Sequence, residues 1–245
     1  MTDDLFRQDA YLRECSAHIT AVTDAGIVLD RTVFYPLGGG QAGDSGVLVL
    51  ADGTEIAIAD TRKGKDAEGN ATSDIVHVPA PGQEALLATL TPGTAASARI
   101  DWERRHRMMR LHTTSHLLCH VVPQLVNGCS ITPDYARLDF AMTDPLDKEQ
   151  LTAAIATLVA AAHPLTVASI SDEELDANPT LVKSMSVQPP RGTGRIRTIR
   201  IGGEGDAPLI DLQPCGGTHV ANTAEIGAIV VTKIEKKSAT TRRVV

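Results

Sequence analysis

The first hundred residues alternate short β-branched runs with turn-forming residues, a pattern typical of β-strands. The predicted strands span residues 18–24, 26–30, 46–50, 55–61 and 74–78. Turn signals separate them, including Asp24-Ala25-Gly26, Ala51-Asp52-Gly53 and the polar stretch 63–73. This spacing predicts a small antiparallel sheet or barrel-like domain over residues 1–100.

The pattern becomes helical near Asp101, and the predicted helix continues to about residue 126. A second helix is predicted to start near Asp144-Pro145, where acidic residues follow, and to stop at Pro164. Its apolar stripe is formed by Leu151, Ile155, Leu158 and Val159. Further strands are predicted over residues 136–141, 165–170, 196–201, 209–212 and 226–233. Because helices and strands do not alternate regularly, residues 101–245 are predicted to form an α+β domain.

Composition limits the classes of function. The 245 residues carry a formal net charge of −7, whereas proteins that coat nucleic acid non-specifically are usually basic. Any contact with nucleic acid is therefore expected to be a local patch or an engagement with one end of a molecule. The N-terminal residues show no signal pattern, and no apolar run approaches the roughly 18 residues of a membrane span. A cytoplasmic protein without membrane contact is expected.

The predicted first helix carries histidines four residues apart, at His112, His116 and His120. Residues at this spacing lie on one face of a helix, so two of these rings could bind one metal ion. The spacing alone does not say which pair would bind it, and packing histidines give the same pattern. Thr113 occupies the place of the glutamate that a zinc peptidase motif requires, which disfavours that class.

A second motif reads Cys215-Gly-Gly-Thr-His219. Its glycines allow a tight turn, from which a thiolate and an imidazole can reach the same ion. Together with two helix histidines they would form a Cys-His₃ set, which suits tetrahedral Zn²⁺. The other cysteines are interpreted as small buried side chains, because four cysteines are too few for a disulfide scaffold.

A third motif is the glycine-rich segment over residues 34–46, which contains Gly38-Gly39-Gly40-Gln41. Its glycines follow neither the P-loop order nor the dinucleotide-binding order, so nucleotide binding is disfavoured. Two interpretations stay open. The segment is a turn-rich loop between strands, or its backbone amides and the Gln41 side chain reach a substrate.

Taken together, the motifs resemble the AlaX proteins, the freestanding relatives of the alanyl-tRNA synthetase editing domain. The resemblance runs in order through residues 34–46, Asp101-Trp102-Glu103-Arg104-Arg105, 112–118, 137–140, 215–220 and 233–244. It implies one Zn²⁺ per chain, with His112, His116, Cys215 and His219 as ligands and His120 as a structural residue. It also implies a small β-barrel-like domain followed by a two-layer α+β editing domain.

The resemblance further implies hydrolysis of the ester that joins a wrong amino acid to the acceptor end of tRNA(Ala). Serine is the expected amino acid, and glycine is the second candidate, because a pocket made for alanine separates such analogues by only about 10- to 200-fold. Gln41 and Thr132 are the candidate catalytic residues that read the substrate, with Ser130 as a further reader. Gly38, Gly39 and Gly40 are the expected substrate loop.

Binding of tRNA by an acidic chain needs local positive charge. The predicted contacts flank the motifs and are Arg104, Arg105, Lys236, Lys237, Arg242 and Arg243. The loop over residues 186–194 is a candidate flexible segment near the site. Oligomeric state does not follow from the sequence.

Two other functions compete with tRNA editing. A zinc-stabilised module could bind RNA or protein without catalysis, because four protein ligands complete a tetrahedral ion. A metal-dependent esterase could act on small aminoacyl esters, and it would not need the basic residues.

Overall fold

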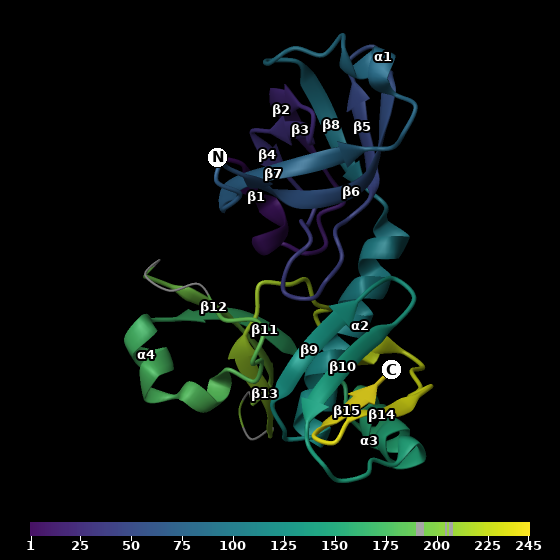
Figure 1. Cartoon of the computed structure of the whole chain (residues 1–245), viewed down its shortest axis with the longest axis vertical. Coiled ribbons are helices and arrows are strands. Elements are labelled where there is room, and N and C mark those ends of the chain that lie inside the picture. Colours follow the sequence, from purple (N-terminus) through teal and green to yellow (C-terminus); the bar gives the residue numbers. More distant parts are fainter. Residues whose placement is uncertain (190–193, 204, 206–207) are drawn as a thin grey trace. The chain divides into compact units, whose positions relative to one another are not determined.

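A computed structural model describes residues 1–189, 194–203, 205 and 208–245. The chain divides into two compact units, Met1–Arg107 and Met108–Val245, and each is described by itself. The predicted boundary after residue 100 falls at the end of a strand (β8, Ala95–Ile100). The predicted mixture of helices and strands is confirmed (Figure 1). Part of the predicted flexible loop, residues 190–193, lies outside the described residues.

The first unit is built on a closed ring of antiparallel strands in the order β2-β3-β7-β6-β5-β8 (Figure 1). The ring strands are β2 (Glu14–Thr23), β3 (Gly26–Leu29), β5 (Gly46–Leu50), β6 (Glu55–Lys65), β7 (Ala71–Pro79) and β8. Two short strands, β1 (Asp3–Asp4) and β4 (Arg31–Thr32), pair in parallel beside the ring. The remaining elements are the short helices η1 (Leu5–Arg7) and α1 (Glu84–Leu87).

Alternate side chains of these strands fill the interior of the ring. Ile19, Leu29, Leu48, Ile56 and Ala98 are almost fully buried there. The five predicted strands are present, but β6 and β7 extend into the stretch that was predicted as a turn, because their pairing continues as far as Lys65 and Ala71. β8 was not predicted, although it closes the ring between β2 and β5.

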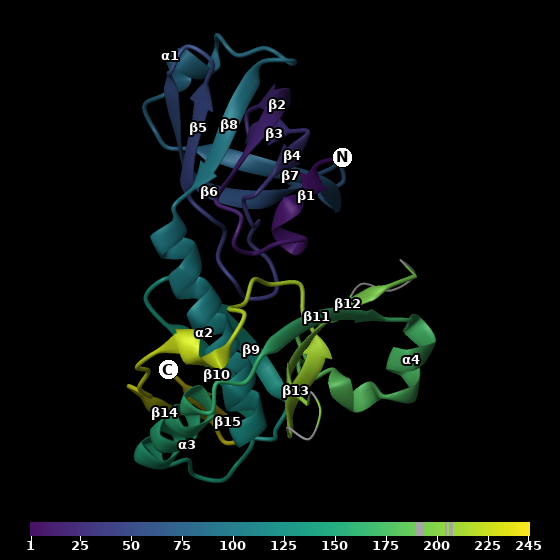
Figure 2. The same ribbon diagram turned by 180° about the vertical axis from the view of Figure 1, so that it is seen from behind.

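The second unit combines two sheets with helices (Figures 1 and 2). Its helices are α2 (Trp102–Val121, which begins in the first unit), α3 (Lys148–Ala160), α4 (Asp172–Ala177), η2 (Pro179–Leu181) and η3 (Thr223–Ile226). A four-stranded sheet contains β14 (Ile234–Ser238), β15 (Thr241–Val244), β10 (Ala136–Ala141) and β9 (Val126–Ile131) in that order. A three-stranded sheet contains β11 (Leu165–Ile170), β12 (Ile196–Gly202) and β13 (Leu209–Pro214). No helix in the described part of the chain has the length and apolar character needed to cross a membrane.

Three boundaries in this unit differ from the prediction. α2 ends at Val121 rather than near residue 126, because Pro123 cannot continue a helix and β9 begins at Val126. α3 ends at Ala160, before Ala162, whose φ of 51° breaks the helix. The predicted strand over residues 226–233 is wrong. Asn222 and Glu225 form a capping box that starts η3 there, and the strand begins only at Ile234.

A buried histidine in the first unit gives the structure a measurable pH dependence. His77 is fully buried, its Nδ1 lies 3.1 Å from the Ile27 carbonyl oxygen, and its Nε2 lies 2.8 Å from the Thr32 hydroxyl. With Nδ1–H donating to the carbonyl, Nε2 accepts from Thr32, so the network fits a neutral ring. Burial lowers the pKa of His77 from 6.5 to about 4.

We therefore expect the free energy of unfolding to fall on acidification. The folded pKa lies below the unfolded value, so the contribution of His77 is complete above pH 6.5 and is lost as the pH drops towards 4. The slope should approach about 1.4 kcal/mol per pH unit. Denaturant titrations at several pH values should show a shallower slope for His77→Gln than for the wild-type chain. The exposed His18 is the control, and an equal change of slope in His18→Gln would contradict the assignment.

Candidate metal centre

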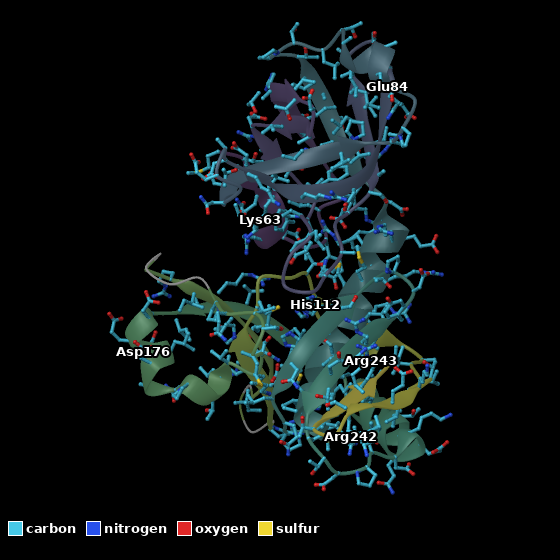
Figure 3. All side chains as sticks on the ribbon, in the orientation of Figure 1. Lys63, Glu84, His112, Asp176, Arg242 and Arg243 are labelled. Carbon is cyan, nitrogen blue, oxygen red and sulfur yellow. The ribbon has the colours of Figure 1, made fainter. Side chains whose placement is uncertain are left out.

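Four side chains of the second unit come together although they lie far apart in the sequence. They are His112, His116, Cys215 and His219, and one possible ligand atom from each lies within 4.8 Å of every other. His112, which is labelled in Figure 3, and His116 come from α2, and the other two come from the turn after β13. The three imidazoles are buried and the cysteine is half-buried.

Two distances within the cluster match the spacing of donors around a tetrahedral ion. The Cys215 Sγ lies 3.5 Å from His112 Nε2 and 3.3 Å from His219 Nε2. Zinc bonds of about 2.0 Å to nitrogen and 2.3 Å to sulfur place neighbouring tetrahedral donors about 3.3 to 3.5 Å apart. One thiolate and three imidazoles are also the donor chemistry that zinc accepts. The residues therefore fit a metal ion of this kind.

The turn that carries Cys215 is held by the neighbouring strand. Arg197 on β12 donates from Nη1 to the carbonyl oxygens of Cys215 and Gly217, at 2.6 and 3.1 Å. The Arg197 carbonyl accepts from the Cys215 N–H at 3.2 Å. The Gly217 N–H lies 3.4 Å from the Cys215 sulfur. These contacts hold the backbone of the turn against β12, and they thereby fix the position of the Cys215 thiol.

Two further side chains contact histidines of the cluster at the ring nitrogens that face away from it. The Asp211 carboxylate, on β13, lies 2.8 Å from His116 Nδ1. The Thr113 hydroxyl, on α2, lies 3.2 Å from His219 Nδ1 and accepts the Val220 N–H at 3.3 Å. Neither residue was predicted. A charged residue within the apolar run Leu209-Ile210-Asp211-Leu212 was the available signal for Asp211.

The close packing of these groups changes their protonation. Burial acts to lower the pKa of His116, but hydrogen bonds to Asp211 and Cys215 outweigh it and raise the pKa to about 9. Burial disfavours ionisation of Cys215, but the nearby charge of His112 lowers the thiol pKa well below its usual value. The thiolate is the form of cysteine that binds metal ions, whereas His116 must release its proton when a metal binds.

The glycine-rich segment lies in the first unit. Gly38 and Gln41 exchange two backbone hydrogen bonds, of 3.1 and 3.0 Å, across Gly39 and Gly40. Both middle residues have positive φ, of 58° and 86°, which glycine adopts without strain. The Gln41 side chain is fully buried. A Cβ at Gly43 would lie 2.2 Å from the Thr61 carbonyl oxygen, so close packing explains this glycine without a ligand.

Arg105 has a different position from the one expected of a tRNA contact. Its side chain is fully buried, its Nε lies 3.0 Å from Asp44, and Nη1 and Nη2 donate to the Ala10 and Val33 carbonyls. This corrects the expectation, because a guanidinium saturated by buried acceptors does not reach a phosphate at the surface. Arg104 is half-buried and donates from Nη2 to the Gly43 carbonyl at 3.2 Å.

The C-terminal basic residues also include both arginines that bind acceptors within the protein and side chains that are exposed. Arg242 is buried and donates to the Thr143 and Ser238 carbonyls, which corrects its assignment as a surface contact. Arg243 makes a two-pronged ion pair with Asp139, with distances of 2.7 and 2.8 Å. Both lie on β15 (Figure 3). Lys236 and Lys237 are exposed on β14, so they are the members of this group whose charge faces solvent.

Thr132 lies in the turn between β9 and β10. Its hydroxyl donates to the Tyr135 carbonyl at 3.2 Å and accepts from the N–H groups of Asp134 and Tyr135. These bonds account for a threonine at this position through the turn alone. Ser130 lies at the end of β9, opposite Arg137.

Two family models match parts of the chain. Residues 196–245 match the threonyl and alanyl tRNA synthetase second additional domain, and residues 8–104 match the class II (A) tRNA synthetases. The first match contains Cys215 and His219, and the second contains the glycine-rich segment.

The chain is also similar over its whole length to proteins named alanyl-tRNA editing protein AlaX-M. The relative from Saccharolobus solfataricus is 32% identical, with 100% of this chain and 98% of the relative covered. The relative from Methanosarcina acetivorans is 34% identical, with 99% and 97% covered. The alanine–tRNA ligase of Hyperthermus butylicus is 34% identical over 96% of this chain, but the match covers only 24% of the ligase.

Proposed function

The chain belongs to the AlaX-M family of alanyl-tRNA editing proteins, and on that premise we propose that it hydrolyses the ester of mischarged tRNA(Ala). The proposed substrate is seryl-tRNA(Ala), with glycyl-tRNA(Ala) as the second. The observation that carries the proposal is the cluster of His112, His116, Cys215 and His219, whose three imidazoles and one thiol are donors that zinc accepts. Aminoacylation of tRNA would produce the substrate, and the proposed site of action is the cytoplasm.

The selectivity has a physical basis. A synthetase pocket made for alanine rejects serine and glycine only weakly, whereas a site that hydrogen-bonds a hydroxyl strongly disfavours ligands that lack one. A separate serine-reading hydrolase can therefore spare alanyl-tRNA(Ala). We propose Gly38, Gly39 and Gly40 as the loop that presents the substrate. We propose Gln41 as its reader, a role that requires the buried Gln41 side chain to become exposed when the substrate binds. Thr132 is given no role, because its hydroxyl is used within its own turn.

The proposed reaction assigns different roles to the candidate metal ligands and to the basic residues. His112, His116, Cys215 and His219 would hold one zinc ion, which when bound supplies a Lewis acid next to the ester. The Arg197 contacts keep the Cys215 turn in place. Lys236 and Lys237 are exposed and would contribute positive charge towards the acceptor end of tRNA. We do not include three arginines in that surface, because their guanidinium groups already bind acceptors within the protein. They are Arg105, Arg242 and Arg243.

The test is to incubate the purified protein, with its zinc content measured, with tRNA(Ala) carrying serine, glycine or alanine. We expect serine to be released at least about tenfold faster than alanine, since apolar contacts alone already discriminate by that factor. A parallel reaction with seryl-adenosine separates tRNA editing from hydrolysis of small esters. If all three esters survive although the protein holds one zinc per chain, the site is structural and the proposal is wrong.

A further inference from the structure

Asp211 is a buried acid beside the cluster but outside its four donors. It lies on β13, four residues before Cys215, and its residue is only 2% exposed. Burying a carboxylate costs free energy unless hydrogen-bond donors surround it. The position therefore needs an explanation in terms of the groups that Asp211 contacts.

Three donors from different parts of the chain converge on this carboxylate. Oδ2 lies 2.8 Å from His116 Nδ1 and accepts the Gln213 side-chain N–H at 2.8 Å. Oδ1 forms an ion pair with Lys183 Nζ. Because both oxygens are occupied, the carboxylate cannot rotate without losing a charged contact.

Lys183 is itself held in place by the backbone. Its carbonyl accepts the Val126 N–H at 2.8 Å, and the next residue, Ser184, forms a parallel bridge with Val126. The Lys183 ammonium group therefore belongs to a segment that is hydrogen-bonded to β9. Helix α2, strand β13 and this segment meet at one carboxylate.

The consequence for His116 follows from imidazole chemistry. A ring that donates Nδ1–H to a carboxylate keeps its lone pair on Nε2, the nitrogen that faces Cys215 and the cluster. The same contact fixes the plane of the ring. Outer partners of this kind commonly set the tautomer and orientation of metal-binding histidines.

We propose that Asp211, anchored by Lys183, is a positioning residue of the metal centre that holds His116 in its metal-binding tautomer and orientation. Its effect on deacylation rests on the proposed function, but its effect on metal binding does not. Asp211 has no exposed side-chain surface, so it acts through His116 and does not contact a substrate.

The test compares zinc affinities of full-length variants by competition with a chromophoric chelator. Asp211→Asn removes the charge, and an amide N–H turned towards Nδ1 would favour the tautomer that cannot bind metal. We expect zinc affinity to fall by about 10- to 100-fold. The visible absorption spectrum of the Co²⁺-loaded protein should also change, because it reports the geometry of the donors. Lys183→Met, which leaves the His116–Asp211 contact but frees Oδ1, should cause a smaller loss.

Asp139→Asn is the matched control. Asp139 is also an ion-paired aspartate on a strand of this unit, but its partner is Arg243, so its loss should leave zinc affinity unchanged. Thermal unfolding of the metal-free proteins shows whether Asp211→Asn is folded. If it is not folded, the zinc affinity of Lys183→Met tests the proposal instead, because the Lys183 side chain is partly exposed and its replacement should be tolerated.

Unchanged affinity and Co²⁺ spectrum in folded Asp211→Asn, or in Lys183→Met where it decides, would overturn the proposal. A loss as large in Asp139→Asn would also overturn it. A wild-type protein that releases no serine, while Asp211→Asn still loses zinc, would refute the proposed function and leave this inference standing.

Discussion

Substitution of His116 by alanine is expected to remove the bound metal and the deacylation of seryl-tRNA(Ala) together. Zinc sites of four protein donors contribute about 10–16 kcal/mol, which is about 3 kcal/mol per donor. Loss of one donor should therefore weaken zinc binding by roughly 100-fold or more. The substitution also leaves the buried Asp211 carboxylate without one of its donors, which adds to the cost.

The measurement is zinc per chain by elemental analysis and the rate of serine release from the same samples. His120→Ala is the matched control, because His120 lies four residues further along α2 but is exposed and does not belong to the cluster. It should keep both zinc and activity. Full activity in a metal-free His116→Ala protein would refute the role assigned to the cluster.

Replacement of Arg105 by methionine is expected to destabilise the first unit by about 3–5 kcal/mol. The substitution removes the guanidinium from a fully buried ion pair and leaves the Asp44 carboxylate without its opposite charge. The carbonyls of Ala10 and Val33 lose their donors as well. The Asp44 carboxylate also accepts the Tyr35 N–H, so the loss should reach the glycine-rich segment.

Urea titration followed by the fluorescence of Trp102 measures this effect, because Trp102 is the one tryptophan of the chain and lies three residues before Arg105. Arg99→Met is the control. Arg99 pairs with Glu55 on the same ring of strands, but both side chains are more than half exposed, and exposed pairs contribute little. Equal destabilisation by the two substitutions would contradict this prediction, because it would show that burial of the Arg105–Asp44 pair does not increase its contribution to the free energy of unfolding.

The four candidate metal ligands could be predicted from the sequence, and the structure brings them together, because their sequence signals are local. A four-residue interval places His112 and His116 on one helix face whatever the rest of the chain does. The glycines between Cys215 and His219 likewise indicate a tight turn. Strands β10 and β11 have the predicted bounds, since each is a short β-branched or apolar run between clear turns.

The roles of the basic residues could not be predicted, because a sequence shows charge but not burial. Asp44, the partner of Arg105, is 61 positions away, and Asp139, the partner of Arg243, is 104 positions away. Those pairings depend on the register of the folded chain. The apolar run over residues 226–231 favoured a strand, but Gly227 has a φ of 67° and follows a capped helical turn. Backbone conformation outweighed β-propensity there.

The pairing of β8 with both β2 and β5 has a consequence for synthesis on the ribosome. Strand β2 begins at Glu14, yet one of its edges is covered only by β8, which begins at Ala95. Until that strand emerges, β2 and β5 each present an open edge, and open edges are sites of aggregation. Cys215 follows His112 by 103 residues, so the cluster of candidate metal ligands assembles only near the end of translation. A nascent chain whose emerged part ends before residue 95 should therefore depend on chaperones more strongly than one whose emerged part extends past residue 107.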